Sequence, residues 1–308
     1  MALDSLPFEV ICLIAWSLPR TKDQLSLLRT SRRLHDTVIH AIYKQQSNYG
    51  LLGVLRWLLR TGFERGLQHL LSRNNSNGKI NVEPGSILNH TPLLVAIRWG
   101  HLNIVELLLR NGARVNLGTY VPALECAAML DKYYITNLLL RNGAQLEIVG
   151  QGSGLTALAC AVKLGYTALN YNSPPRDHRW CNSSSYKAQS EFAAVIQLLL
   201  THGADPNCKS ILYRSTPMHQ IPEGPWKSPE ELLPLFLGFG ALLDTPDWQG
   251  NTPLHTALRH RAFLRGAVAQ KAWVRQLLKF GANVNAKNMH GDTPFGISFN
   301  DPSVLQLL

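Results

Sequence analysis

One short pattern recurs along this 308-residue chain and constrains its fold more than any other feature. The clearest copy opens at residues 251–257 with Asn-Thr-Pro-Leu-His-Thr-Ala and closes, after a Leu-rich segment, with Gly281 and Ala282. Openings lie at Thr91-Pro92, Val121-Pro122, Thr156-Ala157, Thr216-Pro217, Thr252-Pro253 and Thr293-Pro294, and Gly-Ala closures begin at Gly112, Gly143, Gly203, Gly240 and Gly281. The best-spaced copies keep a period of roughly 33 residues, which indicates a stack of similar structural units.

The residues of this copy predict two helices joined by a turn. Thr252 can cap the first helix, and Pro253 suits the first helical position, where the missing N–H needs no partner. Leu254 and Ala257 lie one turn apart on the same face, and the small Ala lets a neighbouring helix approach closely. Gly281 can adopt the left-handed conformation that ends the second helix.

This pattern resembles the ankyrin repeat, whose signature is T-P-L-H-x-A followed by a Leu-rich helix and G-A-x-x-N. The resemblance implies an all-α fold, an ankyrin-repeat solenoid of helix-turn-helix repeats with hairpin loops, over residues 49–308. We expect about six to seven repeats, with a degenerate first repeat over Leu51–Leu71 and a partial last one. In this family the His of the signature, here His255, is a structural hydrogen-bonding residue.

Three places depart from the pattern. Residues 168–190 are rich in Asn, Pro and Ser and interrupt one repeat, so we expect a loop insertion there. Pro222 and Pro225 follow the opening at Thr216, which predicts a shortened first helix. The sequence stops at Leu308 within an apolar helical pattern, whereas terminal repeats normally have a polar outer face. This leaves three alternatives open: the end is poorly protected, it pairs with another surface, or the natural gene product is longer.

The first 48 residues do not fit the repeat. An L-P-x-E-V segment starts at Leu6, an apolar helical pattern follows, and a second Leu-rich segment ends at Leu34. This resembles the F-box, so we expect an F-box-like helical module over residues 1–48, in an order associated with fungal proteins. In that family such residues dock on the Skp-type adaptor of a cullin–RING ubiquitin ligase. The resemblance makes the adaptor-binding candidates Leu6, Pro7, Val10, Ile14, Leu18, Leu25 and Leu28.

The ankyrin resemblance also gives candidates for binding a target protein. Ankyrin surfaces usually bind through their hairpin tips and the inner face of the first helices, and Trp, Tyr and Arg are enriched at binding hot spots. The target-binding candidates are Trp99, Tyr120, Tyr213, Arg214, Trp248 and Met289. The sequence does not identify the target, although a formal net charge of +10 suits an acidic partner.

The composition of the chain and its lack of catalytic motifs argue against a secreted protein, a membrane protein and an enzyme. The five scattered cysteines contain no C-x-x-C pair, so we expect a reducing compartment, the cytoplasm or the nucleus. No segment reaches the roughly 20 apolar residues of a membrane helix, so we expect no membrane contact. The chain has no Walker loop, G-x-G-x-x-G, H-E-x-x-H or G-x-S-x-G motif. We therefore expect no enzyme, no catalytic residue, no cofactor and no metal.

Three functions stay open. The favoured one is a non-catalytic substrate receptor of a cullin–RING ubiquitin ligase, in which the F-box docks a Skp-type adaptor and the ankyrin stack binds the target. The alternative is a plain ankyrin scaffold whose first residues only cap the stack and have no ligase coupling. The third is a nucleic-acid or chromatin binder driven by the net charge, which the dispersed basic residues make the weakest of the three.

Overall fold

The computed structural model describes residues 55, 58–60, 62–74, 91–117, 120–163, 190–221, 231–259 and 267–298. These residues form helices connected by turns, and none of them lies in a β-strand. The adaptor-binding candidates and the expected boundary near residue 48 fall outside them. The predicted insertion over 168–190 also falls outside, apart from Ser190.

The chain divides into two compact units, Met1–Gly118 and Thr119–Leu308. The described helices of the first unit are α4 (Glu64–Asn74), α5 (Pro92–Trp99) and α6 (Leu102–Arg110). Those of the second unit are α7 (Ala123–Met129), α8 (Tyr133–Arg141), α9 (Ala157–Lys163), α10 (Ser190–Thr201), α11 (Pro217–Gln220), α12 (Leu232–Gly238), α13 (Pro253–Arg259), α14 (Ala267–Lys279) and α15 (Pro294–Ser298). Among the described helices, none has the length and apolar character that crossing a membrane requires.

Helix packing in the first unit supports a degenerate repeat before the opening at Thr91. Helix α4 packs against α6, and α5 packs against α6. Leu59 and Leu67 are completely buried there, as expected for the Leu-rich segments. Helix α4 continues to Asn74, three residues beyond Leu71, where the degenerate repeat was expected to end.

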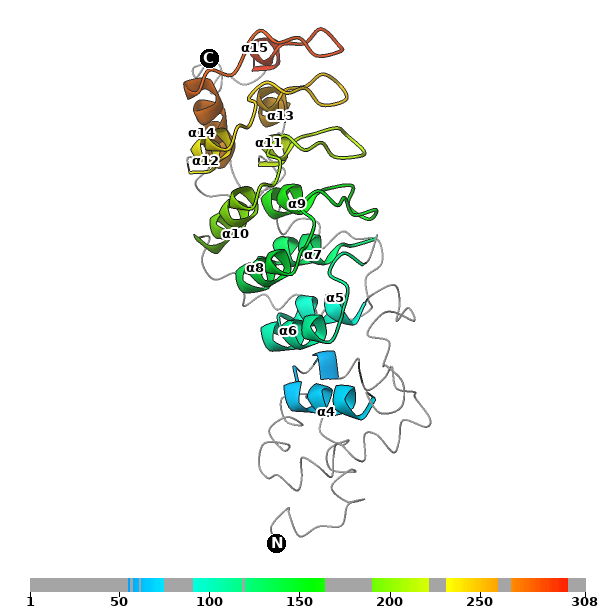
Figure 1. Ribbon diagram of the computed structural model, residues 1–308. Helices are drawn as coiled ribbons and strands as arrows, with labels where there is room; N and C mark the ends of the chain where they lie inside the picture. The colour runs from blue at the N-terminus through cyan, green and yellow to red at the C-terminus, as the bar shows by residue number, and fades with distance from the viewer. Residues whose placement is uncertain are drawn as a thin grey trace. The chain divides into compact units, whose positions relative to one another are not determined.

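The second unit consists of helix pairs in two layers. The first helices α7, α9, α11, α13 and α15 pack on one another in succession, and the second helices α8 and α10 pack together. Figure 1 shows the turns before α9, α11, α13 and α15 projecting side by side beyond the first helices. We call these turns the hairpins, and the array of first helices positions them.

Local signals account for the ends of these helices. Gly281 adopts a φ of 87°, and the N–H of Ala282 donates to the Leu277 carbonyl at 3.0 Å, so the predicted left-handed end of α14 is confirmed. Ala257 is completely buried in α13, where a larger residue would push the neighbouring helix away. Helix α11 has only four residues, as the prolines after it predicted.

Candidate protein-binding surface

Backbone hydrogen bonds join successive hairpins into a continuous ladder. The Trp248 N–H donates to the Tyr213 carbonyl at 3.0 Å, and the Met289 N–H donates to the Gln249 carbonyl at 2.9 Å. These bonds hold three neighbouring hairpins at fixed spacing, because each one closes a contact between two repeats. The side chains of these hairpins therefore stand in one ordered row.

The ladder extends towards the start of the unit. The Ile211 N–H donates to the Gly154 carbonyl at 2.9 Å, and the Gly152 N–H donates to the Tyr120 carbonyl at 3.0 Å. Tyr120 is half exposed and lies two hairpins before Tyr213 in this series. The ladder therefore contains four of the predicted target-binding residues: Tyr120, Tyr213, Trp248 and Met289.

Large apolar side chains are exposed along this ladder. We define the hairpin strip as Ile211, Leu212, Tyr213, Arg214, Trp248 and Met289. The exposed fractions of its apolar members are 64% for Ile211, 68% for Leu212, 57% for Tyr213, 47% for Trp248 and 75% for Met289. Scattered exposed hydrophobic residues are ordinary, but a contiguous row of them is typical of an interaction site.

Two members of the strip, Ile211 and Leu212, were missed by the sequence reasoning. They lie between the closure at Gly203 and the opening at Thr216, in a turn where the pattern predicts polar residues. Two adjacent aliphatic residues in such a turn were the signal that could have found them. The Leu212 side chain lies beside Gly154 of the preceding hairpin, where an added Cβ would be 3.5 Å from it.

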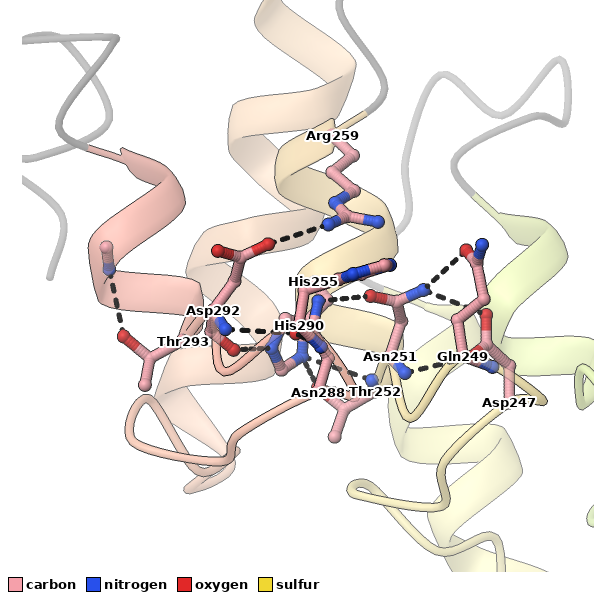
Figure 2. A network of polar contacts seen from close by, with 11 residues as sticks. Asp247, Gln249, Asn251, Thr252, His255, Arg259, Asn288, His290, Asp292 and Thr293 are labelled. Atoms are coloured by element: carbon pink, nitrogen blue, oxygen red, sulfur yellow. Dashed lines mark hydrogen bonds and ion pairs between the residues drawn. The ribbon is translucent and has the colours of Figure 1, made fainter.

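A polar network fixes the hairpins beneath the strip (Figure 2). One Asp247 carboxylate oxygen accepts from the Gln249 and Asn251 N–H groups, each at 2.8 Å. The Asn288 side chain repeats this arrangement and accepts from the N–H groups of His290 and Asp292 at 2.9 and 3.0 Å. Each of these two hairpins is therefore closed by one of its own side chains.

The neighbouring hairpins are also linked by side chains. The Asn288 amide donates to the Asn251 side-chain oxygen at 3.0 Å, across 37 residues of sequence. The Arg259 guanidinium pairs with the Asp292 carboxylate at 3.0 Å. These contacts leave the network satisfied internally, so the hairpins present a fixed backbone to a partner.

His255 and His219 connect one repeat to the next in the same way. The N–H of Thr252 donates to Nδ1 of His255 at 3.1 Å, and Nε2 of His255 lies 3.1 Å from the Asp292 carbonyl oxygen. A backbone N–H only donates, so Nδ1 must be unprotonated and Nε2 must carry the hydrogen. The structural role expected for His255 is confirmed.

His219 has the same pair of contacts, which the sequence reasoning missed, although Thr216-Pro217-Met218-His219 repeats the spacing of Thr252 to His255. The Thr216 N–H donates to its Nδ1 at 3.1 Å, and its Nε2 lies 2.9 Å from the Asn251 carbonyl oxygen. Burial lowers the pKa of both imidazoles below the usual value of 6.5 because it disfavours the charged form. Both therefore act as neutral structural links.

Glu125 occupies the position of this His in α7. It is completely buried, and among the described residues neither carboxylate oxygen has a hydrogen-bond partner of regular geometry. Burial raises the pKa of Glu125 to about 7, while weaker polar contacts with Ser153, Cys160 and the Gly150 backbone lower it. Burial outweighs these contacts because a charge loses most of its hydration in the packed interior.

The buried cysteines nearby carry free thiols. The Cys208 sulfur lies 3.0 Å from the Thr156 hydroxyl, and burial raises the pKa of Cys208 to about 12. Burial and the neighbouring Glu125 carboxylate raise the pKa of Cys160 well above its ordinary value. Both thiols remain protonated, which makes them small buried hydrophobes in this fold.

The remaining target-binding candidate, Trp99, lies at the end of α5 in the first unit. It is partly buried, and the Arg60 guanidinium lies 5.2 Å from the centre of its ring, within the range of a cation–π contact. Its role in target binding stays a prediction. In the part of the chain that the structure describes, no three His, Cys, Asp or Glu residues are grouped to hold a metal ion.

Comparison with known families agrees with this geometry. A family model described as three copies of ankyrin repeats matches residues 28–148, and one described as an ankyrin repeat matches residues 249–289. The chain contains ankyrin repeats. The first match begins at residue 28, inside the range predicted for the amino-terminal module.

Two relatives show how far this ankyrin likeness extends. Human "Ankyrin repeat and SOCS box protein 6" is 29% identical over 142 residues, which is 46% of this chain and 32% of that protein. Mouse "NF-kappa-B inhibitor delta" is 29% identical over 211 residues, which is 66% of this chain and 61% of that protein. The chain thus spans less than two thirds of each of these relatives.

Two solved structures share the ankyrin fold. The ankyrin repeat domain of Bcl-3 has a TM-score of 0.62 and 23% identity, and the likeness covers 82% of this chain and 96% of that one. The ankyrin repeat domain of human ASB11 has a TM-score of 0.57 and 20% identity, with coverage of 82% and 95%. At this identity the likeness supports the all-helical ankyrin fold alone.

Proposed function

We propose that this protein is a non-catalytic receptor that holds a protein target on the hairpin strip. Ankyrin repeats bind protein partners, and they are present here. The observation that carries the proposal is the row of five large exposed apolar side chains on hairpins joined by backbone hydrogen bonds. Contact with a partner would remove this apolar surface from water, which is the main favourable term in most protein association.

The rigidity of the hairpins supports the same function. Asp247 and Asn288 close two of the hairpins internally, so little backbone freedom remains to be lost when a partner binds. Preorganised surfaces bind more tightly because less ordering entropy is lost in the complex. Trp248 and Tyr213 belong to the residue types that dominate binding hot spots.

A strip variant and a matched control test this proposal. Proteins that co-purify with the wild type, with Trp248→Ala/Met289→Ser and with Tyr134→Ala are compared by quantitative mass spectrometry. Tyr134 is the control because it is 73% exposed but lies on the second helix α8. We expect a partner that the strip variant loses and the control retains. An identical set of partners for all three proteins would reject the strip as the binding surface.

Ligase coupling is the second part of the proposal. The L-P-x-E-V segment at Leu6 and the Leu-rich segment ending at Leu34 support an F-box-like module that docks a Skp-type adaptor. Target and ligase would then share one chain, and the gain in rate would come from effective concentration. The alternatives are a plain ankyrin scaffold and, more weakly, a nucleic-acid or chromatin binder.

Adaptor binding distinguishes the first two alternatives. The purified wild type and Leu6→Ala/Pro7→Ala are compared for binding to a Skp-type adaptor and for thermal unfolding by circular dichroism. Adaptor binding by the wild type alone, with similar unfolding curves, would support ligase coupling. Absence of binding by the folded wild type would leave the scaffold function. A lower melting temperature of the variant would assign Leu6 and Pro7 to a structural cap.

A further inference from the structure

The backbone of Arg214 is exceptional among the hairpins. Gly154, Gly250 and Gly291 each lie two residues before the Thr that opens the next repeat, with φ values of 68°, 76° and 77°. Arg214 stands at the equivalent place before Thr216 and has a φ of 49°. An L-residue is disfavoured in this left-handed region because its Cβ comes too close to the following carbonyl oxygen. The chain thus keeps an Arg where three other hairpins use Gly.

Hydrogen bonds within the turn hold the Arg214 backbone, since its N–H donates to the Ser210 carbonyl at 3.0 Å, but none of them uses its guanidinium. Arg214 is exposed, and no described residue forms an ion pair or a side-chain hydrogen bond with it. Arg259, in contrast, pairs with Asp292. Strained backbone persists where the surrounding structure fixes it, and such residues cluster at binding sites, so the outlier favours a role for the exposed guanidinium outside the fold.

The charges along the strip favour an acidic partner. Lys209 and Lys287 are exposed on the first and third of its hairpins. Within the three turns, residues 209–214, 245–250 and 286–291, the cations Lys209, Arg214 and Lys287 outnumber the one carboxylate, Asp247, whose hydrogen bonds come from neutral groups. Asp292, just beyond the third turn, pairs with Arg259. The turns therefore carry an excess of positive charge beside the apolar side chains, in a chain whose net charge is +10.

The geometry points to an acidic, extended peptide segment as the occupant of the hairpin strip, with Arg214 binding one of its carboxylates. This inference rests on the proposed function and specifies its partner. Neighbouring hairpins follow the spacing of packed helices, about 10 Å, so Tyr213 to Met289 spans roughly 20 Å, or about six extended residues. A single row of side chains fits a single extended strand, with apolar residues about three positions apart and acidic residues between them.

Arg214 is suited to select such a carboxylate. Its planar guanidinium can donate two parallel hydrogen bonds to one carboxylate, which a Lys ammonium cannot do. The apolar row would then supply contact area, while Arg214 would set the position of the peptide along it. A neutral or basic peptide of the same apolar spacing would leave this guanidinium without a partner.

Defined peptides test the inference. Three pools of fluorescein-labelled seven-residue peptides carry Leu, Phe or Trp at the first, fourth and seventh positions, with Asp and Glu, with Gln, or with Lys between them. Binding to the full chain is measured by fluorescence polarisation for the wild type, Arg214→Gly, Arg214→Gln, Trp248→Ala and Arg275→Gln. Arg275 is the control because it is an exposed arginine on the second helix α14.

Arg214→Gly separates binding from folding because the two effects have opposite directions. We expect the acidic pool to bind best, Arg214→Gly and Arg214→Gln to weaken it about 10-fold, and Arg275→Gln to bind as the wild type does. The melting temperature of Arg214→Gly should be unchanged or higher by about 2 °C, since Gly relieves the left-handed strain.

Each contrary result has a distinct meaning. Unchanged binding of the acidic pool by Arg214→Gly would overturn the role of Arg214. Better binding of the neutral or basic pool, lost in Trp248→Ala, would overturn the acidic partner but leave the strip as a binding surface. Binding of a single-stranded oligonucleotide at the strip in place of the acidic pool would assign the positive charge to nucleic acid. No binding of any pool by the folded wild type would reject the peptide, while co-purification tests the receptor function separately.

Discussion

Replacing Glu125 by Gln should change how the stability of this protein depends on pH. Glu125 is completely buried in α7, and burial raises its pKa from 4.5 to about 7. The native state therefore binds this proton more tightly than the unfolded state does. Between pH 4.5 and about 7 the folded protein holds more protons, so its stability falls as the pH rises. Gln keeps the shape of the protonated side chain but cannot ionise.

The structure sets the size of this effect. The pKa rises by about 2.5 units, from 4.5 to about 7, and each unit corresponds to about 1.36 kcal/mol. Ionised Glu125 therefore lowers the free energy of unfolding by about 3 kcal/mol at high pH, as an order of magnitude. Most of this difference develops between about pH 5 and pH 8, where we expect the wild type to lose about 2–3 kcal/mol relative to Glu125→Gln.

Urea unfolding of both proteins at about pH 5, 6.5 and 8 measures this difference. Comparing the wild type with the variant at each pH cancels the contribution of other titrating groups, including His219 and His255, whose lowered pKa values act in the opposite direction. Equal pH dependence of the two proteins would show that Glu125 is hydrated or paired in the native state, and the reasoning from burial would be wrong.

Three further predictions concern the hairpins and the buried thiols. His255→Ala should lower the free energy of unfolding by about 2 kcal/mol because it removes the link between Thr252 and the Asp292 carbonyl. Since the pKa of His255 is lowered, this loss should be larger at pH 7.5 than at pH 5. Urea titrations at both pH values measure the loss, and an equal loss would argue against a neutral imidazole. Gly250→Ala should destabilise the fold by about 1–2 kcal/mol, because its φ is 76° and its Cβ would lie 3.1 Å from the Met289 nitrogen; a melting temperature equal to that of the wild type would contradict this geometry. Cys160 and Cys208 should resist alkylation by iodoacetamide in the native protein and react after unfolding, since burial raises the pKa of both thiols. Mass spectrometry detects the alkylation, and rapid reaction of either thiol in the native state would show that its burial is incomplete.

Local signals made the repeat predictable from sequence. Thr252 and Pro253 at the start of one helix, and Gly281 at the end of another, act through the backbone within a few residues. These signals need no knowledge of distant contacts, so the helix pairs and the shortened α11 followed from the sequence, whereas the structural role of His255 came from the ankyrin resemblance. The spacing of the copies then implied a stack, since one helix pair cannot bury its apolar face alone.

The properties of the candidate surface depended on contacts between repeats. The sequence placed Tyr213, Arg214, Trp248 and Met289 in separate turns, and only the hydrogen bonds between hairpins align them in one row. The pairing of Asp292 with Arg259, which leaves the cations of the three turns in excess, is likewise invisible without the fold.

Sequence by itself thus determined the repeating unit, because capping, helix termination and helical periodicity are short-range properties of the backbone. Tertiary structure decided what the exceptional residues do. Glu125 stands where two other repeats place His219 and His255, and its raised pKa arises from the packed neighbours that exclude water. Arg214 occupies a place where three other hairpins use Gly, and its φ of 49° is known only from the folded turn. The physical reason is that burial and the alignment of the hairpins come from contacts between residues that are distant in the chain, while the fold also fixes the backbone angles of each turn.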